Sequence, residues 1–294
     1  MLERSMLTGN KRPRLIEKLR GFFILSRPIN VLISFLSIFI AIVICGPLNN
    51  WPHTILACLT GAFLTAAANA INDVYDLEID RINRPYRPLP SGVITPKGAI
   101  VYSTAFFLLG VLSSAFINMW TLIIALIFSV LLFVYSAKFK RQPVIGNFTV
   151  SLATAFAFLY GGIAVGHVEN AIFPAIFAFL MHFGREIIKD IEDVEGDRSN
   201  NAQTLPIRYG LRAAKKVVTI LLVMLIAVTQ MPCFLNIYGI WYLVVVNIGV
   251  NTVLLFTIFL MWIRPTRSNF RLLSAILKAD MLIGLAAIYL GRWS

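Results

Sequence analysis

Charged residues are scarce in this chain of 294 residues, and cysteine and histidine are rarer still. Only 14% of the residues are charged, whereas 58% are hydrophobic, and the mean hydropathy is +0.79. Soluble domains carry about 25% charged residues, so this composition excludes a soluble globular protein and indicates an integral membrane protein. The three cysteines form no ligand pattern, which argues against a zinc site.

The sequence also shows no cleavable signal peptide, low-complexity segment or soluble domain. Residues 1–20 are basic and polar, and no small-residue cleavage pattern follows a short apolar stretch, so we expect the first apolar helix to be retained. We interpret residues 1–294 as one membrane-embedded domain that begins with this basic segment. The stretch RLIEKLRGFF could form an amphipathic helix on anionic lipid, although a topology signal is the simpler interpretation.

Long apolar runs recur throughout the chain. Nine of them are long enough, or nearly so, to cross a hydrocarbon layer about 30 Å thick. The sequence therefore predicts an all-α, polytopic protein of the cell membrane with nine transmembrane helices. Their approximate limits are 28–46, 53–72, 98–117, 119–137, 144–166, 170–189, 213–231, 237–263 and 272–291.

Basic residues alternate in a regular way along these runs. They cluster before the first run and after every second run, and all but two of the 26 Lys and Arg residues, Lys278 and Arg292, lie on that side. This is the positive-inside pattern, so we expect a cytoplasmic N-terminus and, after nine spans, a C-terminus outside the cell. The same placement accounts for the net charge of +12 without a nucleic-acid partner.

Two acid-rich stretches, NDVYDLEID at 72–80 and DIEDVEGD at 190–197, have the same internal spacing. Each has aspartates at i, i+3 and i+7, positions that lie on one face of a helix. Both stretches lie where an apolar run ends on the basic side, and ten of the fourteen acidic residues lie in or beside them. Carboxylates beside a membrane core are costly without a cation, so the stretches predict one shared functional site at a cytoplasmic mouth. The simpler alternative is that these charged residues only set the membrane topology and form ion pairs at the surface.

The two stretches also share the residues that follow them. Asp80 and Asp197 are each followed by Arg, any residue and Asn, and a Leu-Pro pair comes soon afterwards in both. Four apolar runs separate the stretches. We therefore predict pseudo-duplicated halves that both contribute to one centre.

The chemistry of these side chains indicates Mg²⁺ and a phosphorylated substrate. Carboxylates and the Asn72 amide oxygen are hard ligands, which suit Mg²⁺ better than Zn²⁺. A diphosphate could bridge two such ions, and neighbouring cations could neutralise its remaining charge by paired hydrogen bonds. Those cations are Arg81, Arg84, Arg87, Arg185, Lys189 and Arg198, and VYSAKFKR at 134–141 adds Tyr135 and Lys140 at a third helix end.

With NRPYRPLPSG at 83–92 and RPIN at 27–30, these motifs resemble the UbiA superfamily of intramembrane prenyltransferases over nearly the whole chain. The resemblance implies a nine-helix bundle with a central cavity, in which two Mg²⁺ ions hold a polyprenyl diphosphate whose prenyl chain is transferred to an acceptor. REIIKDIEDVEGDR, followed by TLPIRYG, is most similar to the digeranylgeranylglyceryl phosphate synthase branch, which builds archaeal-type ether lipids.

The resemblance also implies a role for each motif residue. The principal metal ligands that the resemblance implies are Asn72, Asp76, Asp193 and Asp197. Its implied supporting ligands, or partners of those ligands, are Asp73, Asp80 and Asp190. Its implied diphosphate contacts are Arg84, Arg87, Lys140 and Arg198. Tyr135 occupies the position thought to stabilise the allylic cation or to orient the diphosphate.

The acceptor is predicted from the remaining positive charge. Cations beyond those assigned to the donor favour a phosphorylated glycerol lipid as acceptor, and the expected donor is a polyprenyl diphosphate that carries a geranylgeranyl group. These cations are Arg27, Lys138, Lys189 and Arg208, with Arg27 the leading candidate. An aromatic acceptor such as a quinone precursor, a chlorin and haem remain alternatives, as does a membrane transporter of Mg²⁺ or a phosphate compound. Both acidic clusters lie at the same membrane face, and the outer half of the protein carries almost no charge. This distribution favours an enzyme over a transporter.

Overall fold

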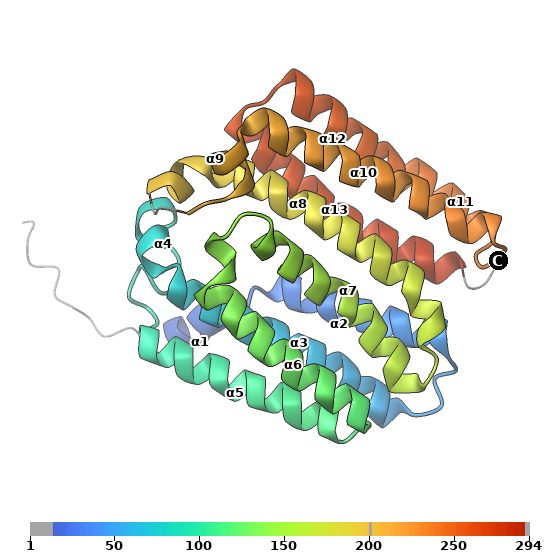
Figure 1. The fold of residues 1–294 in the computed structure, drawn as a ribbon. Helices are drawn as coiled ribbons and strands as arrows, with labels where there is room; N and C mark the ends of the chain where they lie inside the picture. The colour runs from blue at the N-terminus through green and yellow to red at the C-terminus, as the bar shows by residue number, and fades with distance from the viewer. Residues whose placement is uncertain (1–13, 200–201, 292–294) are drawn as a thin grey trace, which may run out of the picture.

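The computed structural model describes residues 14–199 and 202–291, and every regular element in these ranges is helical (Figure 1). Within them, nine segments are long and apolar enough to span a membrane, which confirms the all-α, nine-span prediction. The spanning helices are α2 (Pro28–Cys45), α3 (Trp51–Tyr75), α5 (Pro96–Ala115), α6 (Met119–Ala137), α7 (Ile145–Val165), α8 (Ile172–Ser199), α10 (Leu211–Phe234), α11 (Ile240–Val245) with α12 (Thr252–Ile263), and α13 (Arg267–Gly291). Residues 1–13 of the predicted basic segment lie outside the described residues.

Local sequence signals set where several helices begin. Pro28 is the first residue of α2 and Pro96 the first of α5, positions where the missing backbone N–H of proline costs nothing. Thr95 caps α5 because its hydroxyl accepts from the Gly98 N–H at 3.1 Å. Asn118 caps α6 in the same way, accepting from the Thr121 N–H at 2.9 Å. The Asn118 cap fixes the tight connection between α5 and α6.

The bundle has two halves that meet mainly along two helix contacts (Figure 1). Helices α2–α7 form one half and α8–α13 the other, and α7 packs against α8 while α2 packs against α13. The largest buried apolar cluster lies mainly in the second half, where it includes the fully buried Ile188, Leu222 and Leu273, and it extends to Ala41 of α2 and Phe158 of α7. The outer surface is also apolar, with Trp120 and Ile248 among its most exposed large side chains, as suits contact with lipid. Whether the halves are duplicates of each other stays a prediction.

Small residues let α2 and α7 approach closely. A β-carbon at Gly161 of α7 would lie 2.6 Å from the Ala41 β-carbon and 2.8 Å from the Ile38 carbonyl oxygen, both of α2. Only glycine fits at that distance, a type of contact that is common between membrane helices. This contact holds α2, and therefore Arg27 just before it, in a fixed position relative to α7.

The end of the bundle that carries the acidic motifs is built from short helices. Helix α4 (Leu77–Asn83) follows α3, and α9 (Leu205–Tyr209) precedes α10, and both lie at the left end in Figure 1 together with α1 (Leu15–Leu25). Helix α4 also contacts α8. The two acidic motifs are therefore brought to the same end of the bundle, as the alternation of spans predicts.

Candidate active site

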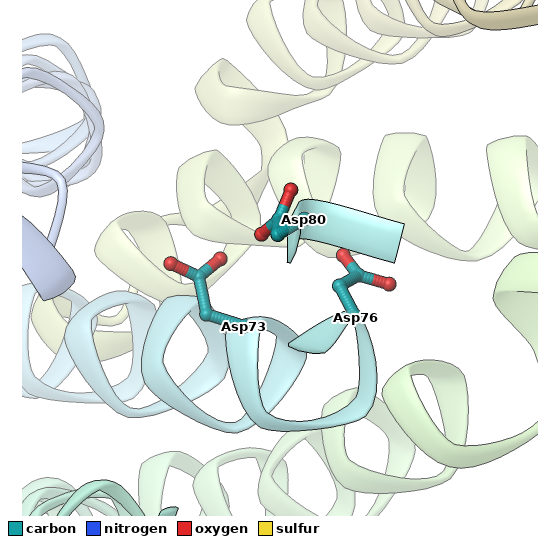
Figure 2. A group of neighbouring side chains, drawn as sticks. All are labelled: Asp73, Asp76 and Asp80. Carbon is teal, nitrogen blue, oxygen red and sulfur yellow. The ribbon is translucent and has the colours of Figure 1, made fainter. Parts of the chain in front are cut away.

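The first acidic motif lies where one helix stops and another starts. Helix α3 ends at Tyr75, Asp76 caps that end and also the start of α4, and α4 begins at Leu77. The prediction that the three aspartates share one face of a continuous helix is wrong, because the chain bends at Asp76. The bend nevertheless gathers the carboxylates of Asp73, Asp76 and Asp80, all buried, with one oxygen of each within 4.8 Å of the others (Figure 2).

Three cations hold these carboxylates in place. The ion pairs join Arg27 to Asp73, Lys140 to Asp76, and Arg87 Nη1 to Asp80 Oδ2 at 2.6 Å and to Asp73 Oδ1 at 3.3 Å. The cations come from the turn before α2, from the loop after α4 and from the turn after α6, so distant parts of the chain converge here. Arg27 also has a left-handed backbone, with φ of 54°, which is uncommon for a residue with a side chain.

Burial and the neighbouring cations shift the pKa values of two of these carboxyl groups in opposite directions. Burial would raise the pKa of Asp76, but the charge and hydrogen bond of Lys140 outweigh it, and the pKa of Asp76 is below its ordinary value. At Asp80 burial prevails over Arg87, and the pKa of Asp80 is raised. Asp76 is therefore held more firmly in its ionised, metal-binding form than Asp80.

Asn72 shows that the cluster fits a hard metal ion. Its Nδ2 donates to Asp76 Oδ2 at 3.0 Å, whereas its Oδ1 is buried and has no hydrogen-bond partner among the described residues. A buried acceptor without a partner is costly and rare. Together with the three carboxylates, this oxygen makes an all-oxygen donor set of the kind that Mg²⁺ prefers.

The second motif lies on an unbroken helix and faces the first. Asp190 accepts from Asn147 Nδ2 at 2.7 Å, and Asp193 Oδ2 lies 3.8 Å from Arg84 Nη2, which comes from the loop after the first motif. Asp197 lies one helical turn after Asp193 on the same helix. Within the described residues the aspartates of this motif do not gather into a compact ligand group as those of the first motif do.

A cavity of about 630 Å³ opens between the two motifs and runs into the bundle. At its mouth lie Asn72 and several of the cations, and its inner walls are mainly apolar, with Ile38, Phe128 and Phe156 among the lining residues. Tyr135 of α6 lines the same cavity. The arrangement provides a charged head site joined to an apolar tail site.

The structure brings most of the predicted contact residues to this cavity. The lining includes Arg27, Asn72, Arg84, Arg87, Tyr135, Lys140 and Lys189. Arg198 is exposed near the end of α8, and Lys138 and Arg208 are also exposed, so these three side chains do not line it. A role for any of them in binding stays a prediction.

The comparison with known protein families now decides what this architecture is. A family model described as the UbiA prenyltransferase family matches residues 32–282. The chain belongs to the UbiA prenyltransferase family. It is therefore an intramembrane prenyltransferase, and the family resemblance found in its motifs is confirmed.

Three similar proteins place the chain within the UbiA family. The digeranylgeranylglyceryl phosphate synthase of Methanosphaera stadtmanae is 34% identical over 265 residues, which cover 90% of this chain and 96% of that protein. A solved structure from work on digeranylgeranylglyceryl phosphate synthase in membranes superposes with a TM-score of 0.76 at 35% identity, covering 94% of this chain and 99% of the other. A UbiA homolog from Archaeoglobus fulgidus, bound to GPP and Mg²⁺, shares the fold with a TM-score of 0.67 at 22% identity, over 91% and 99% of the chains.

Several residues at this UbiA site were not assigned from the sequence. Asn147, which holds Asp190, follows no motif, and no sequence signal identifies it. Glu186 pairs with Arg185 Nη1 at 2.8 Å and with Lys189 Nζ at 3.3 Å. Lys278 lines the cavity although the charge pattern singled it out only as an exception. A lone lysine inside an apolar span was the signal that could have found it.

Proposed function

We propose that this chain transfers a geranylgeranyl group from its diphosphate to the hydroxyl of a glycerol-phosphate lipid and so forms an ether lipid. The observation that carries the proposal is the cavity that joins an oxygen-rich acidic cluster and a ring of cations to apolar walls. The similarity to digeranylgeranylglyceryl phosphate synthase, which extends over 90% of the chain, supports this acceptor over an aromatic one. Membership of the family favours the enzyme over a transporter.

The acidic motifs would hold two Mg²⁺ ions. Asn72 and the aspartates of the first motif fit one ion, and we infer that Asp193 and Asp197 help to hold the second from across the mouth. When bound, the ions would supply positive charge that stabilises the departing diphosphate. Asp190 is held by Asn147 and lies behind these ligands as a support.

The cations at the mouth would change partners when the donor binds. Arg87 and Lys140 are paired with aspartates in this structure, and those aspartates are the groups that a metal would engage. If the carboxylates held a metal, both cations could donate to phosphate oxygens, together with Arg84. The same side chains that stabilise the acidic cluster would then neutralise the leaving group.

The interior protects the developing prenyl cation. Breaking the allylic carbon–oxygen bond leaves positive charge on the prenyl chain, which the face of Tyr135 and the aromatic walls can stabilise. The apolar lining around Phe128 and Phe156 excludes water that would otherwise capture the cation. The acceptor hydroxyl oxygen would then form the new carbon–oxygen bond with the prenyl carbon, and its proton would pass to the departing diphosphate.

We also infer the orientation in the membrane from the basic residues. The acidic motifs and the cavity mouth would face the cytoplasm, and α13 would end outside the cell. The cytoplasmic side is where a soluble supply of Mg²⁺ is available to the mouth.

The proposal is tested by supplying purified protein with geranylgeranyl diphosphate and geranylgeranylglyceryl phosphate, with Mg²⁺ or with EDTA. Mass spectrometry should detect the doubly prenylated ether lipid with Mg²⁺ and none with EDTA. Absence of the ether with metal present, in protein that remains folded, would contradict the proposal.

A further inference from the structure

Lys278 is an unusual residue for its position in the fold. It lies inside the apolar helix α13, where a charged side chain is costly unless it serves a site. It faces the cavity on the same side of α13 as Arg271, Ser274 and Met281, at helical spacings of three to four residues. The cavity therefore explains the position of Lys278 on α13, and membrane topology does not.

The charge of Lys278 has no carboxylate partner among the described residues. Its Nζ donates to Asn30 Oδ1 at 2.6 Å, a neutral amide oxygen at the start of α2. Each of the other Lys and Arg residues that line the cavity has a carboxylate oxygen within 3.8 Å. An ammonium has three donors, so Lys278 can donate two further hydrogen bonds into the cavity.

A second cation lies beside Lys278. Arg185 of α8 donates from Nε to the Ser274 carbonyl oxygen at 3.0 Å, one helical turn before Lys278. Lys189, one helical turn after Arg185 on α8, lines the same cavity. The α8–α13 side of the cavity thus gathers positive charge away from the first-motif aspartates.

The local charges leave a surplus that matches a phosphate monoester. Lys278, Arg185 and Lys189 contribute three positive charges, and Glu186, shared by Arg185 and Lys189, contributes one negative charge, which leaves two positive charges. A phosphate monoester carries a charge of about −1.5 to −2 at neutral pH. Arg27 adds little to this surplus because it is paired with Asp73.

We propose that Lys278 and Arg185, assisted by Lys189, form the binding site for the phosphate of the acceptor lipid. This inference rests on the proposed function and names the part of the cavity that receives the acceptor head group. The set expected from the sequence was Arg27, Lys138, Lys189 and Arg208. The proposal keeps Lys189 and replaces the other three with Lys278 and Arg185. The donor diphosphate has its own cations, Arg84, Arg87 and Lys140, beside the first motif, so two anionic groups can occupy the cavity together.

The test compares two acceptors in wild-type protein and in a variant that lacks the charge of Lys278. The acceptors are geranylgeranylglyceryl phosphate and its dephosphorylated alcohol. Lys278→Met keeps the length of the side chain, and it should lower kcat/KM for the phosphorylated acceptor about 10- to 100-fold. The KM for the donor and the kcat/KM for the alcohol should stay within about twofold, and Lys278→Arg should restore most of the lost activity.

The matched control is Lys216→Met, which removes an exposed lysine of α10 that does not line the cavity and should leave both acceptors unaffected. Thermal unfolding of each variant establishes that it is folded. Equal losses with both acceptors, or a raised donor KM, would refute this binding site while leaving the proposed function intact. A wild-type protein that makes no ether from the phosphorylated acceptor would remove the proposed function and this site with it.

Discussion

The substitution Asp76→Asn tests the metal site with little change in shape. The new amide would keep the volume of the side chain and an oxygen that accepts from Asn72 Nδ2, whereas the charge and one acceptor oxygen would be lost. A charged metal ligand contributes several kcal/mol to the stabilisation of the transition state. If the loss is about 4 kcal/mol, kcat falls about 1000-fold, because each 1.4 kcal/mol or so corresponds to a factor of ten. The Mg²⁺ concentration needed for half-maximal rate should rise as well.

The fold should tolerate this substitution. Lys140 would lose its carboxylate, but its side chain is 30% exposed and can be hydrated, so we expect a loss of stability below about 2 kcal/mol. Glu78→Gln is the matched control, because Glu78 lies in the same motif with a side chain that is 73% exposed and pairs only with Arg81 on the surface. The assay is the rate of prenyl transfer over a series of Mg²⁺ concentrations. A folded Asp76→Asn protein with a rate within about threefold of wild type would refute the metal site.

Three further predictions concern the second motif, the tail cavity and the helix packing. Asp193→Asn should lower kcat/KM for the donor at least about 100-fold, and a steady-state assay that finds a normal value would remove Asp193 from the site. Ala157→Phe should fill part of the inner cavity and lower kcat/KM for geranylgeranyl diphosphate at least about tenfold while sparing the shorter geranyl diphosphate; equal effects on both donors would contradict this interpretation. Gly161→Ala should destabilise the fold by about 1–3 kcal/mol, whereas Gly284→Ala, whose β-carbon would lie 3.9 Å from Val250, should change it by less than about 0.5 kcal/mol, as measured by thermal unfolding in detergent.

Hydropathy and the placement of basic residues were sufficient to predict the spans, because membrane helices are selected for apolar length. The ends were less predictable. Helix α8 extends to Ser199, well beyond the predicted limit of 189, because a helix needs its backbone hydrogen bonds and not apolar side chains to continue. The eighth span contains a π-helical segment, Val246–Asn251, that no hydropathy pattern indicates.

The residue types that form the site could be predicted better than their arrangement in space. The aspartates of the first motif do meet, but they meet at the bend at Asp76 and not along one helix, since the sequence does not show where a helix will break. The partner of Asp190, Asn147, lies 43 residues away in the chain and could be identified only once α7 and α8 were seen to pack together. The direction in which Lys278 points likewise depends on how α13 is rotated against its neighbours.

The central claim is that this cavity joins a prenyl group to a phosphorylated glycerol lipid. The most direct measurement is a competition in which purified protein in lipid vesicles receives Mg²⁺, a limiting amount of labelled geranylgeranyl diphosphate, and equal concentrations of geranylgeranylglyceryl phosphate and 4-hydroxybenzoate. We expect the label to enter the ether lipid at least about tenfold more than the aromatic product. A predominance of prenylated 4-hydroxybenzoate would contradict it.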